Sequence, residues 1–468
     1  MNNKQKKFPS HYLCLIAACA LHMAGAGAAP ANTNHCFGAV TMIRDNSGRH
    51  TRSLVKSSDG TWLEFGRIHA PAASNGKPSL FKWYAASLDK SFLPVRECLD
   101  SQTDSDYTLA AIPNDDDSII TVNRNNVTEA INNPSADKLP HSTLAIETMT
   151  AKMSSLRLVC LPCEARDFFL HGCTRGNNHS IVLYGMSSAA GTFLPQNLKR
   201  DGVFGFVHSV DPVNSKTWTH VLDDGLRSYV TSSILKKDGR LAIAGGVVTK
   251  RGPPVKQGIS ENYSYGLLQF LDSNGKTTGE RTFNSTKAAS VSRIAESSDG
   301  GLIIAGSYVG ELKCGEFSAT NQSNAGTFYV GSLSKTDELR WLFGADGGHT
   351  AIMKILPLKR DHFLILMENY WSQTVAVFKG RNLKPIGEKN LTLLLMNGAG
   401  DFLGSTRIAG VVGGDFASYP LLTVYADDSK DVIVVFSAKG NVSLGEPTKL
   451  LGKYDQFRQF FVKCPVDF

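Results

Sequence analysis

Recurring aspartates are the first residues of this chain whose type and spacing could do chemistry. Asp59, Asp238 and Asp299 each precede a glycine and then an aliphatic segment. Carboxylates repeated at such an interval could form a ring of oxygen ligands for a cation. Asp-Gly before a strand is also ordinary turn chemistry, because glycine readily adopts the positive φ that such turns need. The turn interpretation is favoured, and we predict no metal site and no cofactor.

A Cys-x-x-Cys motif, from Cys160 to Cys163, is the second candidate. This spacing serves both redox enzymes and zinc sites. Redox function would need the motif at the N-terminus of a helix, whereas this segment has the pattern of a strand. Zinc would need two more ligands, which His171 and Cys173 could supply. For an exported chain, disulfide bonds are favoured over both alternatives.

Seven cysteines follow the leader segment described below: Cys36, Cys98, Cys160, Cys163, Cys173, Cys314 and Cys464. Cys36 and Cys464 lie near the two ends, so a bridge between them would close a very long loop. Cys98 and Cys160 are 62 residues apart, which is one period of the repeat introduced below. Cys163 and Cys173 are expected across one hairpin. Cys314 then remains as the unpaired thiol.

Other motifs with chemical meaning are weak. The segment from Asp272 to Gly275 resembles the start of a calcium loop, but Phe283 stands where a bidentate glutamate is required. We therefore expect a hairpin turn there. The chain has no GxSxG, HExxH or P-loop motif, so no catalytic residue is predicted from sequence.

The elements that must position these residues form a repeat. A polar turn followed by an aliphatic strand recurs around Asp59, Asp116, Asn178, Asp238, Asp299, Asp361 and Asp428. Successive separations are 57, 62, 60, 61, 62 and 67 residues. A strand-rich unit of this length is typical of a propeller blade.

Each repeat also has a front half, as in residues 265–283 and 327–344, where two hydrophobic strands flank a polar turn. The sequence thus predicts an all-β fold, a seven-bladed β-propeller of four-stranded antiparallel blades. Pairing of N- and C-terminal strands would close the ring and remove free sheet edges. The expected blades are 36–68 together with 454–466, 79–124, 143–188, 203–249, 264–310, 326–371 and 374–438.

Residues 1–28 have the layout of a secretory signal peptide: lysines, an apolar run and an Ala-x-Ala site ending at Ala28. A lipoprotein signal ending at Cys19 is the less favoured alternative, because the apolar run continues past it. Residues 29–468 are expected to be one domain in the periplasm or outside the cell. No other stretch is long and apolar enough for a transmembrane helix.

The formal charge is +7, and three of the lysines lie in the leader, which leaves +4 on the mature chain. That charge is too small to indicate binding to nucleic acid. The insertions at residues 251–262 and 310–324 are longer and more polar than the other connections. Long loops on a rigid scaffold often carry recognition, so we expect a binding surface there.

The segments SSDGGLIIAGS from Ser297 and FYVGSLSKTDELRW from Phe328 resemble the repeat of bacterial secreted β-propeller proteins. The resemblance implies an exported location and a binding or scaffolding role without catalytic residues. One departure is His362, which stands where the repeat has glycine.

The functional hypothesis is a non-catalytic binding or scaffold protein that binds a protein or a glycan through one face of the propeller. It would act as a monomer or as part of an envelope assembly. The alternative is a glycan lyase or hydrolase with a site at the central channel. A quinone-cofactor dehydrogenase is a weaker third option, because the five tryptophans are not periodically placed.

Overall fold

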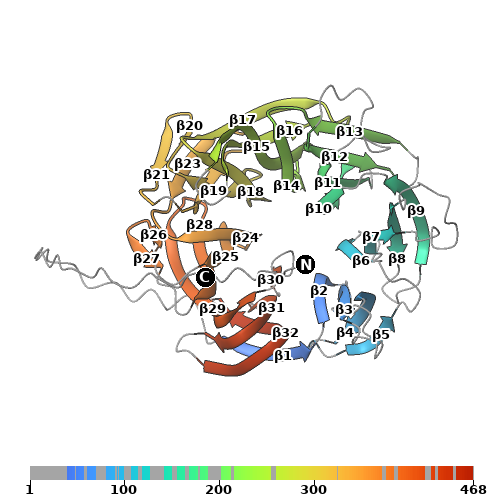
Figure 1. Ribbon diagram of the computed structural model, residues 1–468. Coiled ribbons are helices and arrows are strands. Elements are labelled where there is room, and N and C mark those ends of the chain that lie inside the picture. Colours follow the sequence, from blue (N-terminus) through green and yellow to red (C-terminus); the bar gives the residue numbers. More distant parts are fainter. Residues whose placement is uncertain are drawn as a thin grey trace, which may run out of the picture.

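The computed structural model describes residues 40–47, 49–56, 61–69, 81–89, 92, 94–99, 107–113, 119–126, 142–149, 155–163, 168–177, 180–187, 202–211, 216–254, 260–323, 325–370, 376–383, 388–416, 423–426, 431–445 and 449–466. Every named element in these ranges is a β-strand, so the chain is all-β. Neighbouring strands pair antiparallel, except for one parallel contact between β16 (Ser260–Leu271) and β18 (Ala288–Glu296). Figure 1 shows the sheets arranged around a common centre.

Strands that follow one another along the chain pair in sets of four, and further pairings join some of these sets into a ten-stranded and an eight-stranded sheet. The first three sets are β2 (Arg49–Lys56), β3 (Trp62–His69), β4 (Phe81–Leu88) and β5 (Pro94–Leu99); β6 (Tyr107–Pro113), β7 (Ile119–Asn126), β8 (Ser142–Met149) and β9 (Ser155–Cys163); and β10 (Phe168–Arg175), β11 (Ile181–Ser187), β12 (Phe204–Val210) and β13 (Thr217–Leu222).

The next sets are β14 (Arg227–Leu235), β15 (Leu241–Pro254), β16 (Ser260–Leu271) and β17 (Thr277–Ser285); β18 (Ala288–Glu296), β19 (Leu302–Val309), β22 (Thr327–Leu333) and β23 (Leu339–Gly344); β24 (His349–Pro357), β25 (His362–Tyr370), β28 (Lys389–Asn397) and β29 (Phe402–Phe416); and β30 (Thr423–Ala426), β31 (Asp431–Leu444), β32 (Lys449–Pro465) and β1 (Thr41–Ser47). Further hairpins are β20 (Glu311–Cys314) with β21 (Phe317–Thr320), and β26 (Ala376–Phe378) with β27 (Arg381–Leu383).

The two ends of the described chain meet in one sheet. β1 pairs antiparallel with β32, from Thr41 opposite Lys463 to Ser47 opposite Arg458. β32 pairs in turn with β31, so the earliest described strand lies at the edge of a sheet built from the last strands. This pairing satisfies backbone groups that would otherwise form an open edge.

The strand pairing differs from the predicted unit boundaries by half a repeat. The expected unit 264–310 contains β16 and β17, which pair with β14 and β15, and also β18 and β19, which pair with β22 and β23. At the N-terminus, β2 and β3 pair with β4 and β5 rather than with residues 454–466. The prediction placed the connection between β17 and β18 inside one blade. In the structure this connection runs from the last strand of one set to the first strand of the next.

Sheet faces pack on both sides, which explains the continuous aliphatic runs in the sequence. In β25, Leu364 and Leu366 pack in one core with Val434 of β31. Phe363 and Ile365, on the opposite face, pack in a second core that contains Phe328 of β22. Each sheet is therefore held between its two neighbours by burial of apolar side chains.

The first strand of each set lies nearest the centre in Figure 1, and most of these strands carry a β-bulge. Register shifts leave one extra residue at Arg52, Leu109, His171, Thr231, Ser292 and Met353. These bulges recur at the same interval as the Asp-Gly turns. A bulge bends the strand and turns backbone groups away from the ladder.

Side chains at the bulges bond to the inner strand of the next sheet. His171 Nδ1 donates to the Val230 carbonyl at 2.5 Å. Thr231 Oγ1 donates to the Val291 carbonyl at 2.8 Å, and Arg293 Nε donates to the Met353 carbonyl at 2.7 Å. Side-chain hydrogen bonds thus connect the inner strands of neighbouring sheets, from β10 to β14, from β14 to β18 and from β18 to β24.

The Asp-Gly segments form turns, as predicted. Gly239 and Gly300 have φ of 84° and 81°. Asp238 accepts from the Arg240 amide, and Asp299 accepts from the Gly301 amide, both at 3.0 Å. Despite partial burial, hydrogen bonds from Ser297, Gly301 and Arg340 lower the pKa of Asp299 to about 2. These carboxylates serve their own turns, whereas Asp59 lies outside the described residues.

We predict that Arg293→Met destabilises the protein more than a matched change at the surface. Arg293 bonds to carbonyls on β24 and β14, and hydrogen bonds to charged groups contribute about 1.5–3 kcal/mol each. Arg340→Met removes an ion pair with Asp299 whose side chains are both 40% exposed, so its cost should stay below about 1 kcal/mol. Urea unfolding of both variants measures the difference. Equal free energies of unfolding would contradict the proposed role of Arg293.

Candidate functional site

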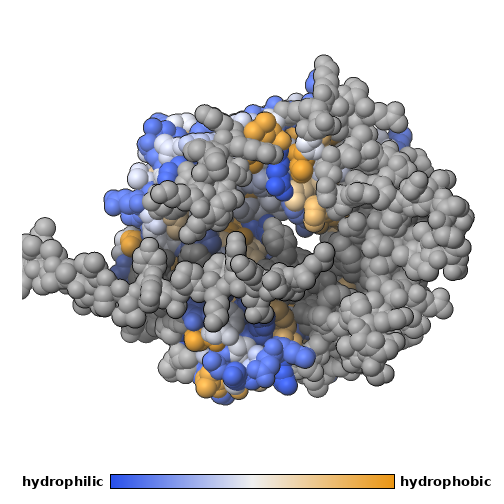
Figure 2. All heavy atoms as spheres, in the orientation of Figure 1, coloured by the Kyte–Doolittle hydropathy of each residue, from blue (hydrophilic) through white to orange (hydrophobic). Residues whose placement is uncertain are grey.

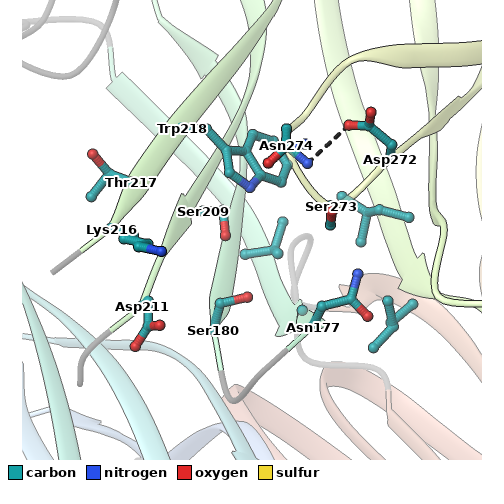
Figure 3. Close-up of a pocket in the computed structure, with 14 residues that line it drawn as sticks. Asn177, Ser180, Ser209, Asp211, Lys216, Thr217, Trp218, Asp272, Ser273 and Asn274 are labelled. Carbon is teal, nitrogen blue, oxygen red and sulfur yellow. Dashed lines mark hydrogen bonds between the residues drawn. The ribbon is translucent and has the colours of Figure 1, made fainter. Parts of the chain in front are cut away.

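A cavity of about 380 Å³ lies on the rim where the β10–β13 sheet meets the β14–β17 sheet. We call it the rim pocket. Turns between strands supply most of its wall, and Figure 3 shows polar side chains converging on it. Its lining residues are Gly176, Asn177, Ser180, Val182, Ser209, Asp211, Lys216, Thr217, Trp218, Leu235, Leu241, Asp272, Ser273 and Asn274.

The next junction along the chain, between the β14–β17 and β18–β23 sheets, has charged and aromatic side chains at the equivalent place. Lys236 has a fully buried side chain, and its Nζ lies 2.7 Å from Asp337 Oδ1. Arg240 also pairs with Asp337. Both cations lie over the Phe270 ring, at 5.1 and 5.2 Å from its centroid. We call these four residues the Lys236 cluster.

The backbone shows which residues of the first junction are equivalent. The Gly176 amide donates to the Ser180 carbonyl as the Lys236 amide donates to that of Arg240. Strand register places Ser209 where the next sheet has Phe270, because Val210 faces Ile181 as Leu271 faces Leu241. Likewise, the Gly275 amide closes its turn onto Asp272 as the Asp337 amide does onto Ser334.

At the rim pocket, smaller residues stand at the four positions of the Lys236 cluster. Gly176, Ser180, Ser209 and Gly275 occupy the positions of Lys236, Arg240, Phe270 and Asp337. The same backbone frame is closed by an ion-paired cluster at one junction and left hollow at the preceding one. The volume of this hollow lies within the range of small-molecule sites.

Trp218 forms one wall of the rim pocket from β13. Gly275 lies against its indole, and a Cβ at Gly275 would come within 2.3 Å of Trp218 Cε3. Gly275 also has φ of 79°, so the turn has two reasons to require glycine. The close backbone approach fixes the position of the indole, which remains partly exposed.

Polar groups surround the indole on three sides in Figure 3. Asp211 and Lys216 lie on one side, the turn from Asp272 to Asn274 lies on the other, and Ser180 and Ser209 lie between them. Hydrogen bonds from the Lys276 and Asn274 amides hold the pKa of Asp272 below its usual range. Asn177 Nδ2 donates to the Gly239 carbonyl at 2.6 Å, which ties the two sheets together beside the pocket.

A second polar cluster lies in the β24–β29 sheet, at the point where β24 begins and β25 ends. Tyr370 donates to Glu368 Oε2 at 2.9 Å. The rings of His349 and Tyr370 have centroids 5.2 Å apart, and Lys389 Nζ lies 5.5 Å from the Tyr370 ring. Lys389 also bonds to Asp415 at 2.5 Å. We call these five residues the Tyr370 cluster.

Glu368 is the perturbed group of the Tyr370 cluster. It is 3% exposed. Burial raises the pKa of Glu368 to about 7, against the hydrogen bond from Tyr370 and the charge of Lys389, which both lower it. Burial also lowers the pKa of His349. A carboxyl group that titrates near neutral pH can hold or release a proton under ordinary conditions.

Cys163 and Cys173 do not lie across one hairpin. Cys163 ends β9, the last strand of its set, whereas Cys173 lies in β10, the first strand of the next set. The two strands do not form a hairpin because the chain crosses between sheets here. Cys173, Cys314 and Cys464 are free thiols, and His171 bonds to Val230, so the zinc alternative gains no support.

The remaining disulfide candidates stay predictions. Cys36, the predicted partner of Cys464, lies outside the described residues. Cys98 and Cys160 lie in β5 and β9, which are the last strands of their sets. Among the described residues, no group of three or more His, Cys, Asp and Glu side chains is placed to hold a metal ion.

The insertions expected to form a recognition surface fold onto the sheets. Residues 310–324 contain the hairpin β20–β21, and β20 pairs with β17 of the preceding set. Residues 251–254 and 260–262 extend the pairing of β15 with β16. Sequence reasoning missed the rim pocket itself. The small residues Gly176, Ser180 and Ser209 gave no distinct signal, because the repeat from Ser297 has Ser297, Gly301 and Ser332 at the same positions.

Exposed apolar side chains do not gather into one patch in the part of the chain that the structure describes. The large ones are Met42, Phe169, Leu226, Val377, Val412 and Leu450, which belong to several different sheets. Figure 2 shows polar and apolar residues interspersed over the coloured part of one face. Within the described ranges, no helix has the length and hydropathy to span a membrane.

Comparisons with known proteins give no family. No family model matches the chain, and no curated protein matches it. Among solved structures, the polysaccharide lyase Uly1 is 8% identical over 89% of this chain and 90% of that one, with a TM-score of 0.45. A protein of unknown function from Dyadobacter fermentans is 12% identical over 92% and 100%, with a TM-score of 0.38.

The Synechocystis apocarotenoid oxygenase is 9% identical over 76% of this chain and 71% of that one, with a TM-score of 0.38. These similarities are too weak to carry an argument about fold or activity.

We predict that Glu368→Gln removes a pH dependence of stability. The folded pKa of about 7 exceeds the ordinary value of 4.5, so folding favours the protonated form. Stability should fall as pH rises from 4.5 to 7, by at most about 3 kcal/mol. At pH 8 the Gln variant should therefore be more stable than wild type, with the difference vanishing near pH 4.5.

The measurement is urea unfolding across this pH range, with Glu316→Gln as control because Glu316 is exposed. Identical pH profiles for wild type and both variants would show that Glu368 is not perturbed.

Proposed function

We propose that the chain folds as a seven-bladed β-propeller, in which each set of four strands is a blade. Three observations support this architecture: the repeated pairing order, the bulged inner strands around a common centre, and the pairing of β1 with β32. The N-terminal leader at residues 1–28 would direct export to the periplasm or beyond. It lies outside the described residues.

We propose further that this protein is a non-catalytic binding protein that takes a glycan at the rim pocket. The observation that carries the proposal is a hollow of about 380 Å³ at a junction whose neighbour is filled by the Lys236 cluster. The volume is within the range of small-molecule sites, and the wall is formed by turns on a rigid scaffold.

The lining favours a saccharide over a protein segment. A saccharide ring offers an apolar face, which suits a fixed indole, and hydroxyl groups, which suit short polar side chains. Trp218 supplies the aromatic surface, while Ser209, Asn274 and Asp211 supply donors and acceptors around it. A docked protein would need a broader apolar surface than the scattered exposed residues provide.

The test is a glycan array with the tagged mature protein, followed by calorimetric titration of the best ligand. Trp218→Ala should weaken binding by about tenfold or more, because loss of one aromatic contact costs about 1.4 kcal/mol or more. Ser180→Arg, which restores the residue type of Arg240, should block the pocket.

Ser318→Arg is the matched control, because Ser318 is exposed on β21 and does not line the pocket. It should bind as wild type does. Unchanged binding in Trp218→Ala and Ser180→Arg would exclude the rim pocket as the site.

The Tyr370 cluster favours a second candidate, a glycan hydrolase or lyase with a site near the mouth of the channel. A carboxyl with pKa near 7 beside a tyrosine and a histidine has the groups needed for general acid–base chemistry. If this candidate is right, the protein cleaves a polysaccharide. The Tyr370→Phe variant should then lose that activity while it remains folded. An absence of new reducing or unsaturated ends across a polysaccharide panel would exclude it.

A further inference from the structure

We propose that the wall of the central opening carries an oxyanion-binding site, formed by Arg293 on β18 and Lys354 on β24. This site is separate from the rim pocket, so the inference goes beyond the proposed function. Figure 2 shows the opening near the middle of the molecule. In Figure 1, β18 and β24 are among the inner strands that surround it.

The two cations occupy the same position in neighbouring sheets. Each follows the extra residue at a bulge, since Arg293 comes directly after Ser292 and Lys354 comes directly after Met353. In the other bulged inner strands of the described chain, this position holds a small neutral residue: Ser53, Ala110, Gly172 or Ser232. Long cationic side chains therefore gather on one part of the wall.

Hydrogen bonds place the Arg293 guanidinium across the inner edge of β18. Its Nε donates to the Met353 carbonyl on β24 at 2.7 Å, and its Nη1 donates to the Thr231 carbonyl on β14 at 3.3 Å. Nη1 also donates to the Ser292 carbonyl at 2.7 Å. The guanidinium thus reaches the inner strands on both sides of its own. Nη2 donates to no residue that the structure describes, so its two hydrogens are available to a ligand.

Lys354 is exposed although it lies on an inner strand. Desolvation by the surrounding protein lowers the pKa of Lys354, and the charge of Arg293 lowers it further. A side chain that is accessible to water and yet surrounded by protein belongs on the wall of an opening rather than on the outer surface. The effect of Arg293 on this pKa shows that the two charges are close enough to interact.

No carboxylate of the described residues balances this pair of charges. Every hydrogen bond from Arg293 to a described residue ends on a neutral backbone carbonyl. Lys354 forms no ion pair within the same part of the chain. Two like charges in a partly desolvated place repel each other. An oxyanion that accepts hydrogen bonds from Arg293 Nη2 and Lys354 Nζ would remove this repulsion.

The chemistry that this site recognises is a group with at least two negatively charged oxygens. Such a group can be a free anion, as in inorganic sulfate, or the carboxylate of an acidic sugar. The experiment is calorimetric titration of the mature protein at low ionic strength, because salt screens such interactions. The ligands are sodium sulfate, a galacturonate oligomer and the galactose oligomer of equal length, which lacks the carboxylates.

Lys354→Met should weaken binding of sulfate or galacturonate by about tenfold or more, because one charge-assisted hydrogen bond is lost. Lys354→Arg keeps the charge and should bind within about threefold of wild type. Lys335→Met is the matched control, because Lys335 is exposed on the turn between β22 and β23, and it should bind as wild type does. Trp218→Ala changes the rim pocket and should leave the anion affinity that depends on Lys354 intact.

Tighter binding of galacturonate than of sulfate would assign the oxyanion to a sugar, and the reverse order would assign it to a free anion. Failure of both anions to bind would overturn the inference. It would also be overturned if Lys354→Met and Lys335→Met had the same anion affinity. None of these results depends on glycan binding at the rim pocket, so the two proposals can fail separately.

Discussion

Hydrogen bonds between neighbouring inner strands are the constraint on which the rest of this structure depends. Bulges turn backbone groups out of the ladders, and those groups need partners in a crowded interior. The partners are side chains of the preceding sheet, as with Thr231 donating to the Val291 carbonyl and Arg293 donating to the Met353 carbonyl. These hydrogen bonds fix the position of each sheet relative to the next. The turns that connect the strands of neighbouring sheets are therefore also fixed relative to one another.

The rim pocket is a consequence of that fixed relation. With the backbone frame repeated, the contents of each junction are decided by a few side chains that can change without disturbing the sheets. Lys236 and Asp337 fill one junction, whereas Gly176 and Gly275 leave the preceding one hollow. A binding site can thus arise by loss of filling side chains, while the apolar cores between sheets provide the stability.

Much of the local structure could be predicted from sequence. The turn at Gly239 and the hairpin at Gly275 follow from glycine chemistry, and the aliphatic runs predict buried strands. The phase of the repeat could not be predicted, because a connection within a sheet and one between sheets look alike as polar segments. The bulges share no residue type, as His171, Thr231 and Met353 show. The pocket could not be predicted because it lies between two sheets formed by different repeats. The raised pKa of Glu368 could not be predicted because it results from burial in the folded chain.

The most direct test of this account is native-state hydrogen exchange of the inner strands in wild type and Arg293→Met. The account predicts that amides of β14, β18 and β24 are protected together in wild type and that all three become more exposed in the variant. Faster exchange confined to β18, with β14 and β24 unchanged, would contradict the claim that sideways hydrogen bonds hold the sheets as one assembly.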